Sequence, residues 1–223
     1  MSTIYIPANR PEDWKQFLAQ PNRQWRDGYS AKELATCWQN ADGFPLNIKK
    51  IFNQSDIPLF NNIQFLIAIP EYKVPLPGGS QPSQNDIFVL AKGNGQLISI
   101  MVEGKVSEPF GPVVSEWIAE KTPGKEKRLE YLCKMIGKNT SDVMNIRYQL
   151  LHRTVSALIE AEKFTADNAL MLVHSFSETD EWFEDYSNFA FLFKTDVNVN
   201  GVFSAGYING INLYLGWVSE SST

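Results

Sequence analysis

Residues 86–106 read DIFVLAKGNGQLISIMVEGKV, and this stretch decides the fold expected for the chain. Two apolar runs, residues 87–91 and 97–102, flank the turn sequence Gly93-Asn94-Gly95. An Asn-Gly pair between two apolar runs is a strong short-range signal for a β-hairpin. We therefore expect two antiparallel strands, and the continuous apolar character of the second strand indicates that it is buried within a sheet.

Similar patterns on either side of this hairpin extend the sheet and supply helices for its faces. Apolar runs predict further strands at residues 63–74, 169–174, 189–193 and 211–218, and the first of these is expected to be buried on both faces. Apolar side chains spaced three or four residues apart predict helices at residues 11–18, 30–41, 114–118, 125–136 and 142–163.

This order of elements predicts a single α/β domain over residues 1–223, with a mixed central sheet flanked by helices. The core is expected within about residues 30–175, preceded by an N-terminal arm and followed by a strand-rich C-terminal extension. We find no internal repeat and no linker between domains in the sequence.

Composition and charge exclude several classes of protein. The chain has 223 residues, a net charge of −5 and 43% hydrophobic residues, which is typical of a globular domain rather than a strongly basic nucleic-acid coat protein. Its only cysteines, Cys37 and Cys133, are too few for a disulfide scaffold and suggest a reducing cytoplasm. No apolar run is long enough to span a membrane, and Met1–Tyr5 lack the pattern of a signal peptide.

Chemistry is most strongly indicated at the hairpin, where acidic residues occur on both expected strands. Glu103 and Lys105 alternate along one strand and therefore project from the same face, and the turn can bring Asp86 beside Glu103. Two carboxylates are hard oxygen ligands for Mg²⁺ or Mn²⁺, and a lysine can stabilise charge that develops on a phosphate. The side chains of Glu103 and Lys105 would face a polar cavity rather than the core, so their removal should change the stability of the fold little.

At this point the chain resembles the PD-(D/E)XK superfamily of restriction endonuclease-like nucleases, over roughly residues 30–175. The resemblance implies an α-β-β-β-α-β core in which Asp86 and Glu103 bind the metal and Lys105 assists catalysis. It also implies an acidic ligand on the first helix, for which Glu33 is the candidate, and a polar residue on the later helix, for which Gln149 is the candidate. Asn85 stands at the position of the name-giving proline.

Simpler structural roles remain open for these residues. Glu103 and Lys105 could form a solvated ion pair, and Glu33 could complete a capping box with Ser30 at the start of its helix. A second Glu-x-Lys sequence begins at Glu71, but the prolines that follow it suggest the end of a strand. The polar side chains opposite the leucine stripe of the last helix could face solvent or border the site; they are Gln149, His152, Arg153 and Ser156.

We therefore expect a Mg²⁺- or Mn²⁺-dependent phosphodiesterase that acts on DNA. The alternative is a nuclease-like fold without catalysis that serves as a binding or regulatory module. Among the basic segments, the N-terminal arm is the better candidate for nucleic-acid contact, because it interleaves cations with Trp14, Trp25 and Tyr29. Many members of the superfamily form dimers, so the resemblance also allows an oligomer.

Overall fold

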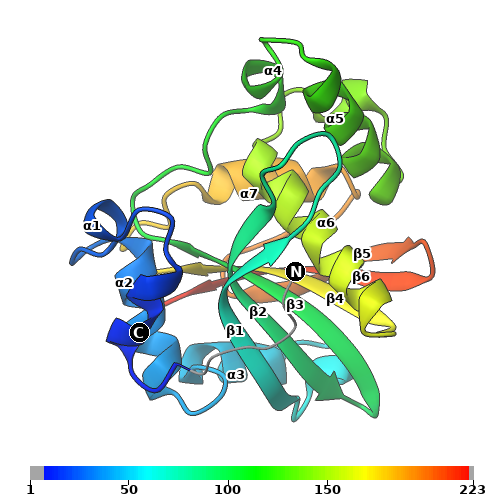
Figure 1. Cartoon of the computed structure of the whole chain (residues 1–223). Coiled ribbons are helices and arrows are strands. Elements are labelled where there is room, and N and C mark those ends of the chain that lie inside the picture. Colours follow the sequence, from blue (N-terminus) through cyan, green and yellow to red (C-terminus); the bar gives the residue numbers. More distant parts are fainter. Residues whose placement is uncertain (1–7, 221–223) are drawn as a thin grey trace.

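A six-stranded mixed sheet forms the centre of the computed structural model, which describes residues 8–220 (Figure 1). The sequence of Met1–Tyr5, considered above for a signal peptide, lies outside the described residues. The strands are arranged in the order β1-β2-β3-β4-β6-β5. Their bounds are β1 Gln64–Val74, β2 Ser83–Gly93, β3 Gln96–Lys105, β4 Asn168–Ser175, β5 Gly201–Ile208 and β6 Ile211–Ser219.

The expected hairpin is confirmed. β2 and β3 pair antiparallel in a register that runs from Ile87 opposite Val102 to Gly93 opposite Gln96. Asn94 and Gly95 form the two-residue turn, and both have positive φ, as the tight turns that match strand twist require. β1 continues the antiparallel part of the sheet, whereas β4 is parallel to both β3 and β6, and β5 is antiparallel to β6.

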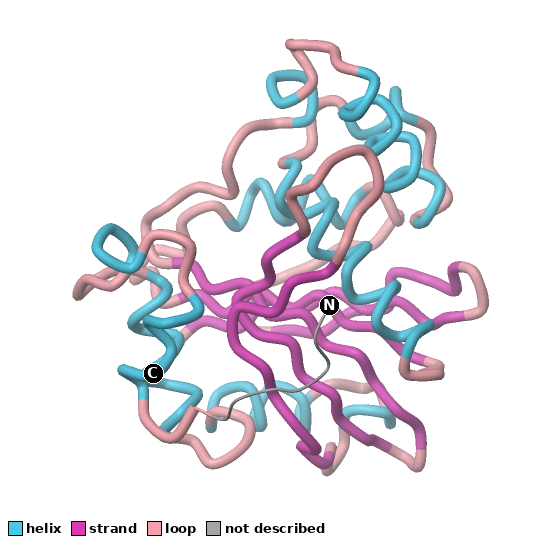
Figure 2. Tube along the Cα trace, in the orientation of Figure 1, coloured by secondary structure: helices cyan, strands magenta, loops and turns pink. Residues whose placement is uncertain are grey.

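Helices cover both faces of the sheet (Figures 1 and 2). One face is covered by α5 (Pro123–Met135), α6 (Tyr148–Lys163) and α7 (Phe183–Phe191), and the other by α2 (Ser30–Asn40) and α3 (Leu46–Gln54). The shorter helices are η1 (Pro11–Phe17), α1 (Pro21–Gln24), η2 (Pro58–Phe60), α4 (Val114–Trp117) and η3 (Thr140–Val143). None of the helices among residues 8–220 is long and apolar enough to cross a lipid bilayer.

Several sequence expectations were wrong. Residues 189–193 lie mostly within helix α7 rather than in a strand, because Tyr186, Phe189 and Ala190 have helical spacing and are buried together. The helix expected from residue 142 begins only at Tyr148, after the separate turn η3. β1 is an edge strand rather than a doubly buried one, and its bulge between Phe65 and Ile67 leaves Leu66 and Ile67 exposed. α3 and β5 were not expected at all.

The C-terminal strands belong to the sheet rather than extending it from outside. β6 lies between β4 and β5, and it contributes Leu213, Leu215 and Trp217 to the core under α6 and α7. The sheet therefore includes residues well beyond the core expected at about residues 30–175.

Gly93 gives a test of how closely the hairpin packs on the preceding loop. A Cβ atom at this position would lie 1.9 Å from the carbonyl oxygen of Leu59, which is backbone and cannot move aside cheaply. We expect Gly93→Ala to lower the free energy of unfolding by about 1–3 kcal/mol, as overpacked sites do. Urea denaturation measures this change. Lys92→Ala, at the exposed neighbouring position, should leave stability within about 0.5 kcal/mol of the original protein; equal effects of the two substitutions would contradict the packing argument.

Candidate functional site

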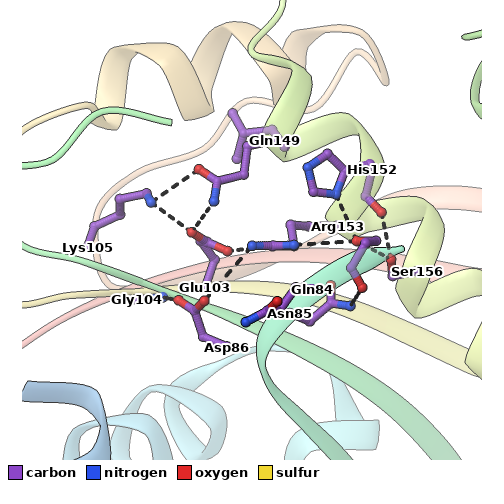
Figure 3. A network of polar contacts seen from close by, with 12 residues as sticks. Gln84, Asn85, Asp86, Glu103, Gly104, Lys105, Gln149, His152, Arg153 and Ser156 are labelled. Atoms are coloured by element: carbon purple, nitrogen blue, oxygen red, sulfur yellow. Dashed lines mark hydrogen bonds and ion pairs between the residues drawn. The ribbon is translucent and has the colours of Figure 1, made fainter. Parts of the chain in front are cut away.

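Carboxylate, ammonium and guanidinium groups converge in a cavity of about 530 Å³ at one end of the sheet (Figure 3). Asp86 comes from β2, Glu103 and Lys105 come from β3, and Gln149 and Arg153 come from α6. The pairing of Ile87 with Val102 places Asp86 next to the position of Glu103, and the alternation of β3 directs Glu103 and Lys105 to the same side. The hairpin register and one helix face therefore build the site together.

Glu103 is the most heavily bonded group of the cavity. Its Oε1 accepts hydrogen bonds from Lys105 Nζ at 2.7 Å and from Gln149 Nε2 at 2.5 Å. Its Oε2 accepts one from Arg153 Nε at 2.5 Å. Glu103, Lys105 and Arg153 are all buried, and although burial opposes the charge of Glu103, the two cations hold the pKa of its carboxyl below the ordinary value.

Asp86 is held more loosely. Its Oδ2 accepts a hydrogen bond from the backbone N–H of Gly104 at 2.8 Å, and its Oδ1 lies 3.9 Å from Arg153 Nη2. Burial and the neighbouring charge of Glu103 raise the pKa of Asp86 to about 7, and this rise is only partly offset by Arg153 and Lys105. Asp86 is therefore only partly ionised at neutral pH, because the protein's own cations stabilise its charged form incompletely.

Glu71 is a third carboxylate of the cavity. From the sequence it was expected only at the end of a strand. It lies within β1, between the pairs Pro70–Ile87 and Tyr72–Asn85, and so opposite Asp86. Its φ of 51° is unusual within a strand, and its Oε2 accepts a hydrogen bond from Gln84 Nε2 at 2.5 Å. Burial and repulsion from Asp86 raise its pKa to about 8. Its Glu-x-Lys sequence was a visible signal, but the backbone conformation that turns it into the cavity was not.

The polar face of α6 borders the cavity rather than solvent. Ser156 and Arg153 are buried, and the hydroxyl of Ser83 on β2 lies 2.8 Å from His152 Nδ1 and 2.9 Å from Ser156 Oγ. Burial, together with the positive charges of Arg153 and Arg128, lowers the pKa of His152 well below its usual range. His152 is therefore neutral, and the cationic side chains of the cavity lining are Lys105 and Arg153.

Glu33 is not brought to this cavity. Its Oε1 accepts a hydrogen bond from the backbone N–H of Gly28 at 3.1 Å, and it is not among the lining residues. The expected capping box with Ser30 was also wrong, because Tyr29 is the N-cap residue and Ser30 begins the helix. Glu108, which follows β3, accepts from the N–H of Ser30 instead, at 3.2 Å. A residue 78 positions away thus caps α2.

The N-terminal arm, the segment before about residue 30, contributes to the lining of the cavity, but not all of its aromatic side chains are available to a ligand. Gln24, Tyr29 and Ser30 line the cavity. Trp14, by contrast, is buried and donates a hydrogen bond from Nε1 to Gln39 Oε1 at 2.9 Å, and Lys15 lies over the ring of Trp25. Two of the three aromatic side chains considered for nucleic-acid stacking are therefore engaged within the protein.

A second cluster of potential metal ligands is formed by Cys37, His174 and Glu220, whose ligand atoms lie within 4.8 Å of one another. The indole N–H of Trp38 donates to His174 Nδ1 at 3.0 Å, so the proton of the neutral ring must be on Nε2, which lies 2.8 Å from Glu220 Oε1. Burial and Glu220 also raise the pKa of the Cys37 thiol to about 12. An ion here would have to displace the protons of the thiol and of Nε2, and in their present form the contacts attach the C-terminal segment to α2 and β4.

The donor set of the larger cavity fits a hard divalent cation. Its lining holds four carboxyl groups (Glu71, Asp86, Glu103 and Glu108) and two cationic side chains, and a dication would favour the ionised forms of Glu71 and Asp86, whose pKa values are raised in its absence. Asp86 and Glu103 are the residues that would hold the ion, with Glu71 nearby. Both oxygens of Glu103 already accept hydrogen bonds, so an ion bound there would compete with its cationic donors.

The chain matches a known family of domains. The model of DUF6946, a domain of unknown function, matches residues 7–222. No curated protein and no solved structure matches the chain.

Asp86 gives a prediction about pH and stability in the metal-free protein. Because its pKa is raised to about 7 in the folded state, stability should decrease as pH rises from about 4 through 7. Asp86→Asn removes this ionisation and keeps an acceptor for Gly104, so its advantage over the original protein should grow to about 1–2 kcal/mol at pH 8. Urea unfolding in EDTA at pH 5 and pH 8 measures it. The exposed control Glu162→Gln should show a difference that is independent of pH; a similarly flat result for Asp86→Asn would contradict the assignment.

The contacts of Glu103 correct the expectation that its removal changes stability little. Glu103→Ala leaves the buried charges of Arg153 and Lys105 without their main partner, which should lower the free energy of unfolding by about 3–5 kcal/mol. Glu103→Gln keeps the shape and one acceptor oxygen and should cost less. Chemical denaturation of both variants at pH 7 measures the difference, and an unchanged midpoint for Glu103→Ala would show that the ion pairs do not form in solution.

Proposed function

Because the chain belongs to the DUF6946 family of domains, whose function is unknown, we propose a function from the site itself: metal-dependent hydrolysis of phosphodiester bonds, with DNA as the substrate. The observation that carries the proposal is the convergence of Asp86, Glu103 and Lys105 with Gln149 of α6 in one cavity. Two carboxylates, a lysine and an amide are a donor set suited to a divalent cation and a phosphate.

The arrangement of elements also supports a nuclease-like core. Helix α2, strands β1, β2 and β3, helix α6 and strand β4 follow one another in the order α-β-β-β-α-β, with other helices inserted between them. β1, β2 and β3 form an antiparallel meander and β4 joins β3 in parallel. We propose on this basis that the chain shares the core of the PD-(D/E)XK superfamily, with Asn85 in place of the proline.

The converging residues Asp86, Glu103, Lys105 and Gln149 each have a role in the proposed reaction. Mg²⁺ or Mn²⁺ held by Asp86 and Glu103 would act as a Lewis acid and lower the pKa of a bound water. Lys105 Nζ lies 3.2 Å from Gln149 Oε1 and 4.8 Å from the centre of the Phe110 ring, so its ammonium is held in place before substrate binds. A fixed positive charge of this kind stabilises the negative charge that builds up on the phosphate during hydrolysis.

The charge balance of the cavity indicates that the substrate binds together with metal. Because the pKa values of Glu71 and Asp86 are raised to about 8 and 7, these two groups are at most partly ionised at neutral pH, but the lining still has no net positive charge to attract a phosphodiester that arrives alone. A divalent cation reverses this balance and attracts the polyanion. We therefore propose that the protein binds DNA at this cavity only weakly in EDTA and more tightly with Mg²⁺ or Mn²⁺.

The contact between Arg153 and Glu103 favours a second candidate function. A buried arginine already neutralises the carboxylate that would bind the metal, at 2.5 Å. If this pair is permanent, the domain is a non-catalytic binding or regulatory module with a nuclease-like fold.

A nuclease assay separates the two candidates. Plasmid DNA and short single- and double-stranded oligonucleotides should be cleaved with Mg²⁺ or Mn²⁺ and not with EDTA. We expect Lys105→Met and Glu103→Gln to lower the rate by about 10²–10³-fold, because each removes a preorganised electrostatic group.

Lys73→Met is the matched control. Lys73 belongs to the other Glu-x-Lys sequence, is exposed and lies outside the cavity lining, so its removal should leave cleavage unchanged. Circular dichroism and thermal unfolding establish that each variant is folded. Absence of metal-dependent cleavage of all these substrates would favour the binding module, and cleavage that survives Lys105→Met would place the activity elsewhere.

A further inference from the structure

The ion pair between Arg153 and Glu103 engages atoms that each side chain could otherwise use to bind a ligand. Arg153 Nε donates to Glu103 Oε2 at 2.5 Å, while Lys105 and Gln149 donate to Oε1, so that an ion on either oxygen meets a cationic side chain (Figure 3). The pair is buried, with both residues less than a tenth exposed. A divalent cation on Oε2 would lie close to the guanidinium, and the repulsion between the two positive groups in this buried place opposes their binding to Glu103 at the same time.

The remaining donors of Arg153 are only weakly engaged. Nη1 lies 3.4 Å from Ser83 Oγ, and Nη2 lies 3.9 Å from Asp86 Oδ1. Ser83 is itself shared with His152 and Ser156. Arg153 also lines the cavity, so its guanidinium borders the space that a phosphate would occupy. A planar guanidinium binds phosphate oxygens through two parallel hydrogen bonds, which is the geometry that Arg153 could offer once freed from Glu103.

From these contacts we propose that Arg153 couples metal binding to phosphodiester binding, an inference that rests on the proposed function. A divalent cation on Glu103 releases the guanidinium for the phosphate, and a phosphate on Arg153 releases Glu103 for the cation. Each ligand thus removes the competitor of the other. Linkage requires the coupling to be reciprocal, so both affinities increase by the same factor.

The coupling is measured with two probes, Mn²⁺ and a fluorescent phosphorothioate oligonucleotide that resists cleavage, in single- and double-stranded form. Fluorescence anisotropy gives the affinity for the oligonucleotide with and without Mn²⁺, and calorimetry gives the affinity of the protein alone for Mn²⁺. We expect Mn²⁺ to tighten oligonucleotide binding at least about fivefold, the lower end of common coupling factors.

Arg153→Met should change all three measurements. Without its competitor, Glu103 binds Mn²⁺ more tightly than in the original protein; without the guanidinium, the oligonucleotide binds more weakly in Mn²⁺, and the effect of Mn²⁺ falls below twofold. Arg153→Lys, which keeps the charge and packs more conservatively, should give the same directions with smaller changes and serves if Arg153→Met does not fold.

Arg147→Met is the matched control for the loss of one positive charge. Arg147 stands at the N-cap of the same helix and pairs with Asp185 at 2.9 Å, so its removal should leave the coupling intact. Coupling that is absent from the original protein although both probes bind, or coupling that survives Arg153→Met, overturns the inference. Coupling without cleavage of ordinary DNA leaves the inference standing and overturns the proposed nuclease activity, whereas absence of Mn²⁺ binding overturns both.

Discussion

The buried carboxylate of Glu103 is the interaction on which the arrangement of the site depends. It stands near the end of β3, a strand of the sheet interior, and gathers donors from its own strand and from α6. A buried carboxylate is costly unless it is paired and hydrogen-bonded, so the helix must present Gln149 and Arg153 at the same height as Glu103. The i, i+4 spacing of these two side chains meets that requirement. The polar network thus fixes how α6 lies over the sheet at the cavity, while Leu150, Leu151 and Val155 on the same helix are buried in the core.

Local patterns were enough to predict the parts of the fold that local forces determine. The Asn94-Gly95 turn specified the hairpin, and strand alternation then placed Asp86, Glu103 and Lys105 together. The same reasoning failed where contacts between residues far apart in the sequence determine the local structure. Glu108 replaced the expected cap of α2 from 78 residues away, and this left Glu33 bonded to Gly28 instead of facing the cavity. Residues 189–193 were misjudged because aromatic composition was weighed above the helical spacing of Tyr186, Phe189 and Ala190.

Glu71 shows a different limit of sequence reasoning. Its residue type and its Glu-x-Lys sequence were visible, but its place in the cavity depends on a positive φ that side-chain patterns do not encode. A non-glycine residue in that conformation costs free energy, which the pairing of β1 with β2 on both sides of it must offset. The polar edge of α6 could likewise be predicted from spacing, whereas its orientation toward the cavity followed only from the packing of the leucine stripe.

The position of β6 has a consequence for how the chain reaches this fold. β6 is the last strand among the described residues 8–220, yet it lies between β4 and β5 and is parallel to β4. During synthesis on the ribosome, β4 therefore emerges well before the strand that covers its outer edge. Every residue of β4 is buried in the finished sheet, and an apolar edge of this kind readily pairs with other chains. The whole sheet cannot close until residues 211–219 are available, and until then the edge of β4 that β6 covers is open to pairing with other chains.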